Sequence, residues 1–266
     1  MDQHRTYLYN AHGHALSGQI VRPFQETIAV QAGMSLPTTG GYGAAHVEDF
    51  RVKEIVSFKS AATQVSGSFN EHDKSHTTLA SVTIENLSIL DVVTADKVVA
   101  RLASRHVANE EEPQIVLIGS HFVNLRIAGC PTTVEFDNER FLRLDTFEAL
   151  RKELESNAEF RKMALDPYRT GKAQESPKPH GVVLCSLVKE IKTTCPGVEQ
   201  RGHVLIVPQF GKIFVGEVIA QHSRRTLTML RLELGSPTSG AITAGQVQGN
   251  GQPYPPTPGG GSGATN

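Results

Sequence analysis

Three short segments of the chain share one pattern, and this repeat limits the fold more than any other feature of the sequence. The segments are residues 47–52 (VEDFRV), 84–89 (IENLSI) and 122–127 (FVNLRI), so their starts lie 37 residues (47 to 84) and 38 residues (84 to 122) apart. Each reads apolar, any residue, Asp or Asn, apolar, polar, apolar. In a β-strand the last two apolar residues share one face. The Asp or Asn before them suits a bulge or a tight bend, because its side chain can bond its own backbone.

Each segment is interpreted as part of a strand-turn-strand unit. Strand-like stretches follow the first two segments, at residues 55–68 and 92–104. One unit cannot bury its apolar face alone, so neighbouring units must stack. A sandwich, a prism and a solenoid-like stack all satisfy this requirement. The repeat predicts that six apolar side chains are buried: Phe50, Val52, Leu87, Ile89, Leu125 and Ile127.

The rest of the chain predicts a mostly β protein with a single amphipathic helix near residues 146–164. Asp145 and Glu148 resemble the two ends of a capping box, and Phe147, Leu150 and Leu154 follow at helical spacing. The predicted organisation is a β-rich repeat region (1–144), a helix and linker (145–180), strands that pack on the same body (181–234), and a tail (235–266).

The tail is predicted to be disordered. Residues 235–266 contain 9 Gly, 5 Pro and no charged residue. Such a composition buries too little apolar surface to offset the entropy lost on ordering.

Two repeat-containing segments resemble the β-repeats of the bacterial "choice-of-anchor P" family. They are residues 84–96 (IENLSILDVVTAD) and 121–129 (HFVNLRIAG), and the likeness extends over about residues 40–136, with a fainter echo at 210–234. The resemblance implies a β-repeat fold. Members of that family are extracellular and carry a signal peptide and a surface anchor, and we expect neither at the ends of this chain. The resemblance assigns no functional residue.

Charge and hydropathy set further expectations. The net charge is −1, which does not favour binding to nucleic acid or to anionic membrane. No stretch approaches the roughly 20 apolar residues of a membrane helix, so we expect no transmembrane segment. The polar start of the chain is not followed by an apolar signal core. Cytoplasmic localisation is the default expectation, and export without a classical signal stays open.

The chain has three cysteines, Cys130, Cys185 and Cys195. An odd number in a long chain without a CxxC pair argues against a disulfide framework. We expect buried, inert thiols. The alternative is a bridge between Cys185 and Cys195, which requires paired strands with suitable Cα spacing.

Histidines are the best candidates for chemistry, although they are weak ones. His12 and His14 would share one face of a strand, and His72 and His76 flank an acidic residue in an expected hairpin tip. Imidazole and carboxylate groups bind zinc only where three or four of them converge. We expect these histidines to be separate and solvated, and we predict no metal, cofactor or catalytic residue.

A local group of basic residues is formed by Lys212, Arg224, Arg225 and Arg231. A charged outer face of a sheet is the favoured interpretation, and a weak anion contact is the alternative.

Three hypotheses of function remain. The first is a non-enzymatic structural or interaction protein of bacterial type, which self-associates into a homo-oligomer through β-rich surfaces. The second is a binding module for a small molecule or glycan. The absence of Trp and an aromatic content of 6% weigh against it. The third is a metalloprotein or enzyme that uses the histidines.

Overall fold

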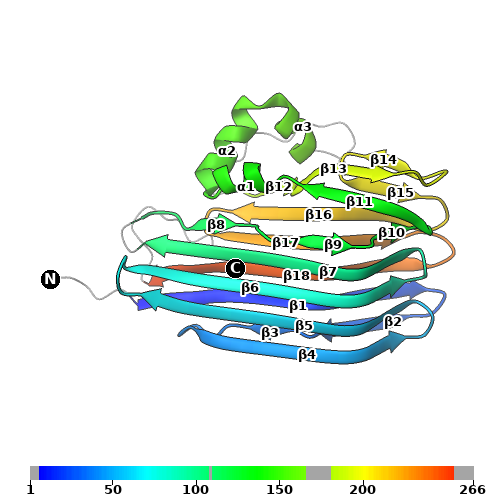
Figure 1. Cartoon of the computed structure of the whole chain (residues 1–266), viewed down its shortest axis with the longest axis horizontal. Coiled ribbons are helices and arrows are strands. Elements are labelled where there is room, and N and C mark those ends of the chain that lie inside the picture. Colours follow the sequence, from blue (N-terminus) through cyan, green and yellow to red (C-terminus); the bar gives the residue numbers. More distant parts are fainter. Residues whose placement is uncertain (1–5, 108–109, 166–180, 255–266) are drawn as a thin grey trace.

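The computed structural model describes residues 6–107, 110–165 and 181–254. The strands form two antiparallel sheets that pack face to face as a β-sandwich (Figure 1). The prediction of a mostly β protein built from strand-turn-strand units is therefore confirmed. Of the three arrangements that the repeat allowed, the chain adopts the sandwich.

One sheet contains all three repeat units, and we call it the repeat sheet. Its strands lie in the order β13 (Val188–Thr193), β11 (Cys130–Phe136), β10 (Arg126–Ile127), β7 (Val93–Val107), β6 (Ser75–Ile89), β5 (Val56–Asn70) and β4 (Gly41–Val52). The short strands β8 (Gln114–Val116) and β9 (His121–Val123) also pair with β7.

The second sheet joins the start of the chain to its C-terminal part. Its strands lie in the order β14 (Glu199–Arg201), β15 (Val204–Val207), β16 (Gly211–Gln221), β17 (Arg224–Leu234), β18 (Ser239–Tyr254), β1 (Thr6–Arg22) and β2 (Glu26–Gln31). The strand β12 (Val183–Ser186) pairs with β16, and β3 (Met34–Ser35) pairs with β1. Leu187 connects the two sheets, because the chain passes from β12 to β13 at this buried residue.

The three repeat units follow the same backbone trace. The third residue of each unit has a left-handed conformation, with φ of 50° at Asp49, 54° at Asn86 and 51° at Asn124. The seventh residue is left-handed as well, at Lys53, Leu90 and Ala128. Asp and Asn tolerate this conformation better than most residues do. The pattern read from the sequence therefore corresponds to a repeated backbone structure.

Equivalent hydrogen bonds connect consecutive units. Leu90 of the second unit donates its N–H to the carbonyl oxygen of Ile55 in the first unit, at 2.7 Å. Ala128 of the third unit donates in the same way to Val92 of the second unit, also at 2.7 Å. The turns of the repeat units are thus stacked on one another at one end of the strands.

The left-handed residues mark a bend that crosses the repeat sheet. The register places five residues of successive strands opposite one another: Asp49, Lys59, Asn86, Asp96 and Asn124. On each side of this row, buried residues alternate with outward ones, but at the row two successive residues face outward. In β6, for example, Ile84 and Leu87 are buried while Asn86 is exposed. The pairing register does not shift across the row. The feature is therefore a bend, and the alternative of a bulge is wrong.

Burial agrees with the repeat for four of the six predicted side chains. Leu87, Ile89, Leu125 and Ile127 are buried. The other two predicted residues, Phe50 and Val52, are only half-buried and pack against the core from the side. The physical reason is that both lie on β4, which is the last strand of the repeat sheet.

A second bend crosses the other sheet and is the counterpart of the first. Ala15, Gly245, Met229 and Gly216 lie opposite one another, and here two successive residues of each strand face inward. In the repeat sheet the two successive residues face outward, and in the second sheet they face inward. Both sheets therefore bend in the same direction. A Cβ atom at Gly245 would lie 3.3 Å from Val98 of the repeat sheet, so the two bends are packed together.

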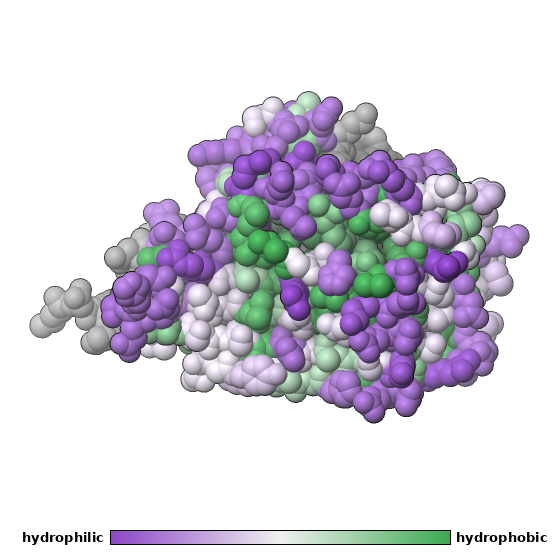
Figure 2. Space-filling view, viewed as in Figure 1, coloured by the Kyte–Doolittle hydropathy of each residue, from purple (hydrophilic) through white to green (hydrophobic). Residues whose placement is uncertain are grey.

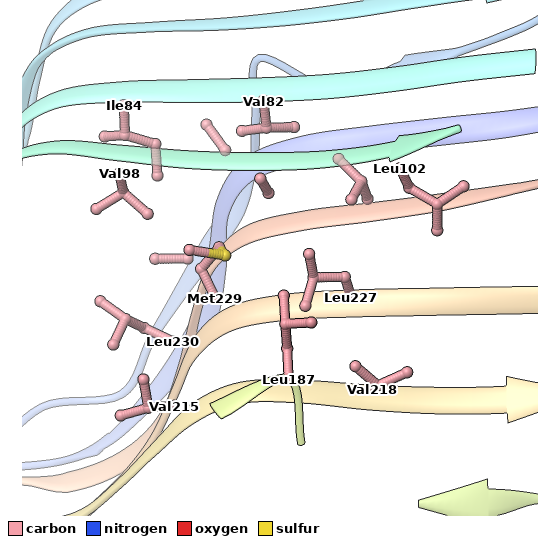
Figure 3. Packing of buried hydrophobic residues seen from close by; sticks show 14 of the residues in the cluster. Val82, Ile84, Val98, Leu102, Leu187, Val215, Val218, Leu227, Met229 and Leu230 are labelled. Carbon is pink, nitrogen blue, oxygen red and sulfur yellow. The ribbon is translucent and has the colours of Figure 1, made fainter. Parts of the chain in front are cut away.

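The core lies between the two inner faces (Figure 3). Val82, Ile84 and Val98 of the repeat sheet lie across from Leu227 and Met229 of the second sheet. All of these side chains are almost completely inaccessible to solvent. Burial of each aliphatic side chain of this size stabilises the fold by about 1.5–3 kcal/mol.

Helices cover one edge of the sandwich (Figure 1). They are α1 (Asn138–Arg143), α2 (Phe147–Ser156) and α3 (Ala158–Leu165), where the sequence predicts a single helix at 146–164. Asn157 separates α2 from α3, and its Oδ1 accepts a hydrogen bond from the Phe160 N–H of α3. None of the helices in the described residues has the length and apolar character that crossing a membrane requires.

The predicted capping residue of the helix is also wrong. Thr146, and not Asp145, is the N-cap of α2, because its hydroxyl accepts the Ala149 N–H. The predicted apolar face is confirmed, since Phe147, Leu150 and Leu154 are buried. Residues 166–180, the linker part of the predicted helix and linker (145–180), lie outside the described residues.

The predicted tail contains the largest error. Residues 239–254 form β18, a strand of 16 residues that lies between β17 and β1 in the middle of the second sheet. Two of its glycines, Gly245 and Gly249, allow the two sheets to approach each other: a Cβ at Gly249 would lie 2.2 Å from Leu102 of the repeat sheet. A glycine-rich composition therefore reflects close packing in this part of the chain. Residues 255–266 lie outside the described residues.

We predict that deletion of residues 238–266 abolishes cooperative unfolding, because it removes a central strand and leaves β1 and β17 without their common partner. Truncation after Tyr254 retains β18 and should retain a cooperative transition. Thermal unfolding followed by circular dichroism compares the two. A cooperative transition at the wild-type temperature in the longer deletion would show that β18 is dispensable.

Candidate functional site: the outer face and open edge of the repeat sheet

A row of side chains crosses the outer face of the repeat sheet. The register aligns Tyr42, Ser66, Leu79, Ala103 and Val116, one from each strand from β4 to β8. Tyr42 is 65% exposed and Leu79 is 44% exposed. Figure 2 views the molecule from this side and shows apolar and weakly polar residues in the middle of the face, with hydrophilic residues around them. We call the five aligned residues, from Tyr42 to Val116, the outer row.

A pocket of about 410 Å³ opens on the outer row. Leu79, Ala103 and Val116 supply its apolar surface. Arg105 and Asp145 contribute one charge of each sign to its lining. Its volume falls in the range of small-molecule sites, which is roughly 300–1,000 Å³.

The arginine of the pocket is held in place by its neighbours. Arg105 Nη2 donates to Asp73 Oδ2 at 3.1 Å, and Nη1 donates to Gln114 Oε1 at 3.3 Å. The Ser75 hydroxyl and the Arg105 guanidinium, which both donate to Asp73, hold the pKa of its carboxyl below the usual value. The position of the Arg105 charge is thereby fixed at the side of the pocket.

The edge of the repeat sheet next to the outer row is open. Within the described residues, β4 forms ladder hydrogen bonds only with β5. The other edge strand of this sheet, β13, carries Lys189, Glu190 and Lys192, charges of the kind that block pairing between sheet edges. Residues 41–45 of β4 (GYGAA) carry no charge. This half of β4 lacks the protection that β13 has.

The four histidines predicted from the sequence lie on different surfaces. His12 and His14 are half-buried on the outer face of the second sheet, because Gly13 between them faces inward, where its Cβ would lie 2.9 Å from Val82. Burial and the nearby Arg224 lower the pKa of His12, and burial and the charge of His12 lower that of His14.

The second histidine pair, unlike the first, is split. His72 is exposed in the hairpin tip, as predicted. His76 is not: it lies in β6 and packs between the sheets against Tyr7. No three His, Cys, Asp or Glu side chains of the described residues are grouped as ligands of a metal ion. The expectation that the protein holds no metal stays a prediction.

A cluster of aromatic and imidazole rings fills the end of the sandwich where His76 lies. Tyr7 stacks on His76 with ring centroids 3.8 Å apart, and Tyr9 Oη lies 2.9 Å from His76 Nδ1. Burial raises the pKa of both tyrosines and lowers that of His76, whose pKa is lowered further by His106. These shifts favour the neutral form of all three rings. Sequence reasoning missed this cluster, because β1, β6 and β7 meet only in the folded chain.

The cysteines form a pair that the sequence did not predict. Cys130 and Cys195 form a disulfide with a Cα–Cα distance of 5.4 Å, which lies within the usual range. The register explains the pairing, since Thr132 of β11 lies opposite Thr193 of β13. Only Cys185 is a buried free thiol, and burial raises its pKa to about 12. The expectation of buried, inert thiols therefore holds for Cys185 and is wrong for Cys130 and Cys195, and the alternative bridge between Cys185 and Cys195 is wrong.

The basic group of the sequence does not form a patch. Arg225 is 1% exposed and donates to the carbonyl oxygens of Ile115 and Thr146, so it connects β17 to β8 and to the N-cap of α2. Burial lowers its pKa to about 10. Arg231 is paired with Glu217 and Glu233. The favoured interpretation, a charged outer face, therefore holds for Arg231 and not for Arg225.

A family model of a domain of unknown function, DUF8256, matches residues 7–221. The chain belongs to this family. The match begins at the second residue of β1 and ends with β16, so β17 and β18 complete the second sheet beyond it. No curated protein and no solved structure matches the chain. The family match does not bear on the resemblance to the choice-of-anchor P repeats, which stays a prediction.

We predict that acid destabilises the protein partly through His76. Its pKa is lower in the folded chain than the unfolded value of about 6.5. The unfolded chain therefore binds the proton more tightly, and the stabilisation, complete above the unfolded pKa, is lost as the pH falls through the folded pKa. A His76→Phe variant keeps a ring against Tyr7 but cannot titrate. Urea unfolding between pH 7 and pH 5 should show a smaller loss of stability in the variant. An equal loss would contradict this role.

Proposed function

We propose that the protein is a non-enzymatic interaction protein that self-associates by pairing β4 of one molecule with β4 of a second copy. The observation that supports this proposal is the uncharged half of the open edge. β4 is 12 residues long, and its exposed backbone groups can extend the sheet by antiparallel pairing.

The sequence of β4 suits a symmetric arrangement. A two-fold axis through Ala44 would pair residues 41–47 of one molecule with residues 47–41 of the second, as an isologous interface requires. Glu48, Asp49 and Arg51 would then lie just outside the paired stretch. The left-handed conformation of Asp49 bends the strand at this point. Charge and bend together confine the pairing to the first part of β4.

Such pairing would join two repeat sheets into one continuous sheet. The outer rows of the two molecules would then lie on the same face, with both Tyr42 side chains close to the two-fold axis. A large regular surface of this kind suits a structural or interaction protein.

The hypothesis of a histidine-based enzyme is less well supported. His12 and His14 lie on the outer face of the second sheet, His72 lies in a hairpin tip, and His76 lies between the sheets. Convergence of these side chains was the requirement of that hypothesis, and they occupy three separate regions. A small-molecule site is favoured by one specific observation, the pocket on the outer row.

We predict that Ala44→Lys prevents self-association. At the proposed axis Ala44 lies opposite its own copy, so the variant places two ammonium groups against each other. Gln64→Lys is the matched control, because Gln64 is exposed on β5 directly opposite Ala44 but not at the edge.

Sedimentation velocity over a range of concentrations measures the effect. The wild type and Gln64→Lys should show a species of twice the 28.8 kDa chain mass, and Ala44→Lys should remain monomeric. A wild type that stays monomeric up to its solubility limit, or an Ala44→Lys variant that still dimerises, would refute the proposed edge.

A further inference from the structure

The pocket on the outer row is bounded by three kinds of surface. Its apolar part consists of Leu79, Ala103 and Val116, which lie side by side on β6, β7 and β8. Side chains of neighbouring strands are about 4.8 Å apart, so these three cover an area about 10 Å across. Gln114 and Asp145 add polar groups beside this surface. The pocket is thus apolar on one side and able to form hydrogen bonds on the other.

Some of the polar groups are available to a ligand. The Asp145 carboxylate makes no hydrogen bond with another described residue, and neither does the amide nitrogen of Gln114. Both side chains are only partly exposed and line the pocket. Arg105 is different, since Asp73 and Gln114 already hold its guanidinium. A ligand in the pocket would therefore meet an acceptor and a donor that have no hydrogen-bond partner among the described residues, and a fixed positive charge.

The charges of the pocket argue against a charged ligand. An anion would be attracted by Arg105 and repelled by Asp145, and a cation would be attracted by Asp145 and repelled by Arg105. Among the lining residues there is no second group of either charge to favour one of them. A wholly apolar ligand would cover Asp145 and Gln114 without replacing their contacts with water, which is unfavourable. The complementary ligand is neutral, with one apolar face and several groups that both donate and accept hydrogen bonds.

We propose that this pocket binds a neutral saccharide. The C–H face of a sugar ring would lie on Leu79 and Ala103, and its hydroxyl groups would donate to Asp145 and accept from Gln114. The outer row continues beyond the pocket to Tyr42, two strands from Leu79. An exposed aromatic ring is a common stacking surface for sugars. A second sugar unit placed along the row would approach this ring.

This inference answers the objection raised by the amino-acid composition. The chain has few aromatic residues and no Trp. One of its five tyrosines, however, is highly exposed on the row that leads into the pocket. A single well-placed ring is sufficient for stacking, so the low aromatic content does not exclude sugar binding.

Saturation-transfer-difference NMR on the full chain tests the proposal. The probes are methyl glucoside, methyl galactoside, N-acetylglucosamine, maltose, cellobiose and chitobiose, with 4-methylpentanoate and isopentylamine as charged apolar comparators. We expect saturation transfer to at least one saccharide and none to the two comparators. Absence of transfer to every saccharide, or transfer only to a charged comparator, would overturn the proposal.

Variants locate the site. Ala103→Phe fills the pocket with a ring from an outward position and should abolish the saccharide signal, whereas Gln64→Lys, on the same face but outside the pocket, should leave it unchanged. Asp145→Asn should weaken binding at least several-fold. Tyr42→Ala should weaken binding of a disaccharide more than that of a monosaccharide. Circular dichroism confirms that each variant is folded. Full binding by a folded Ala103→Phe variant would exclude this pocket as the site.

Discussion

The bend that crosses both sheets is the constraint on which the rest of this structure depends. A long strand can change the face of its side chains only by placing two successive residues on one side. In a sheet this change must occur at the same position in every neighbour, or the register is lost. The row from Asp49 to Asn124 meets this condition in the repeat sheet. The row from Ala15 to Gly216 meets it in the second sheet, with the opposite sense. The two sheets can therefore bend and remain in contact.

The same bend shapes the surfaces that we propose to be functional. In β4 it separates the uncharged residues 41–45 from the charged end of the strand. The outer row lies on the same side of the bend as residues 41–45, where inward and outward side chains alternate regularly. Edge pairing and the saccharide pocket therefore use the same part of the repeat sheet, and the repeat provides the scaffold for both.

Much of the repeat sheet could be predicted from the sequence. The pattern of residues 47–52, 84–89 and 122–127 is local, and it encodes the facing of each side chain together with the left-handed Asp or Asn. The second sheet has no such pattern. Its bend uses Ala15, Gly245, Met229 and Gly216, residues of different types that are brought together only by pairing. By composition the glycines of β18 predict disorder, whereas Gly245 and Gly249 accommodate Val98 and Leu102 of the repeat sheet.

The candidate site was beyond sequence reasoning for a related reason. Tyr42, Leu79 and Val116 are separated by about 37 residues each, and only the register of β4 to β8 aligns them. Cys130 and Cys195 likewise meet because β11 pairs with β13. The absence of charge at residues 41–45 was visible in the sequence. Its consequence depends on the position of β4 at an edge of the sheet, which the sequence does not indicate.

The most direct test of this account compares two substitutions of Asn86. This residue is exposed and has a φ of 54°, so its backbone conformation, rather than its contacts, is what the bend requires. Glycine adopts this conformation readily, whereas a β-branched residue does so at a cost of about 1–2 kcal/mol. The free energy of unfolding, measured in urea, should be within about 0.5 kcal/mol of wild type for Asn86→Gly, the variation expected at an exposed site. It should be lower by at least about 1 kcal/mol for Asn86→Val. Equal stability of the two variants would contradict the claim that left-handed residues fix the bend.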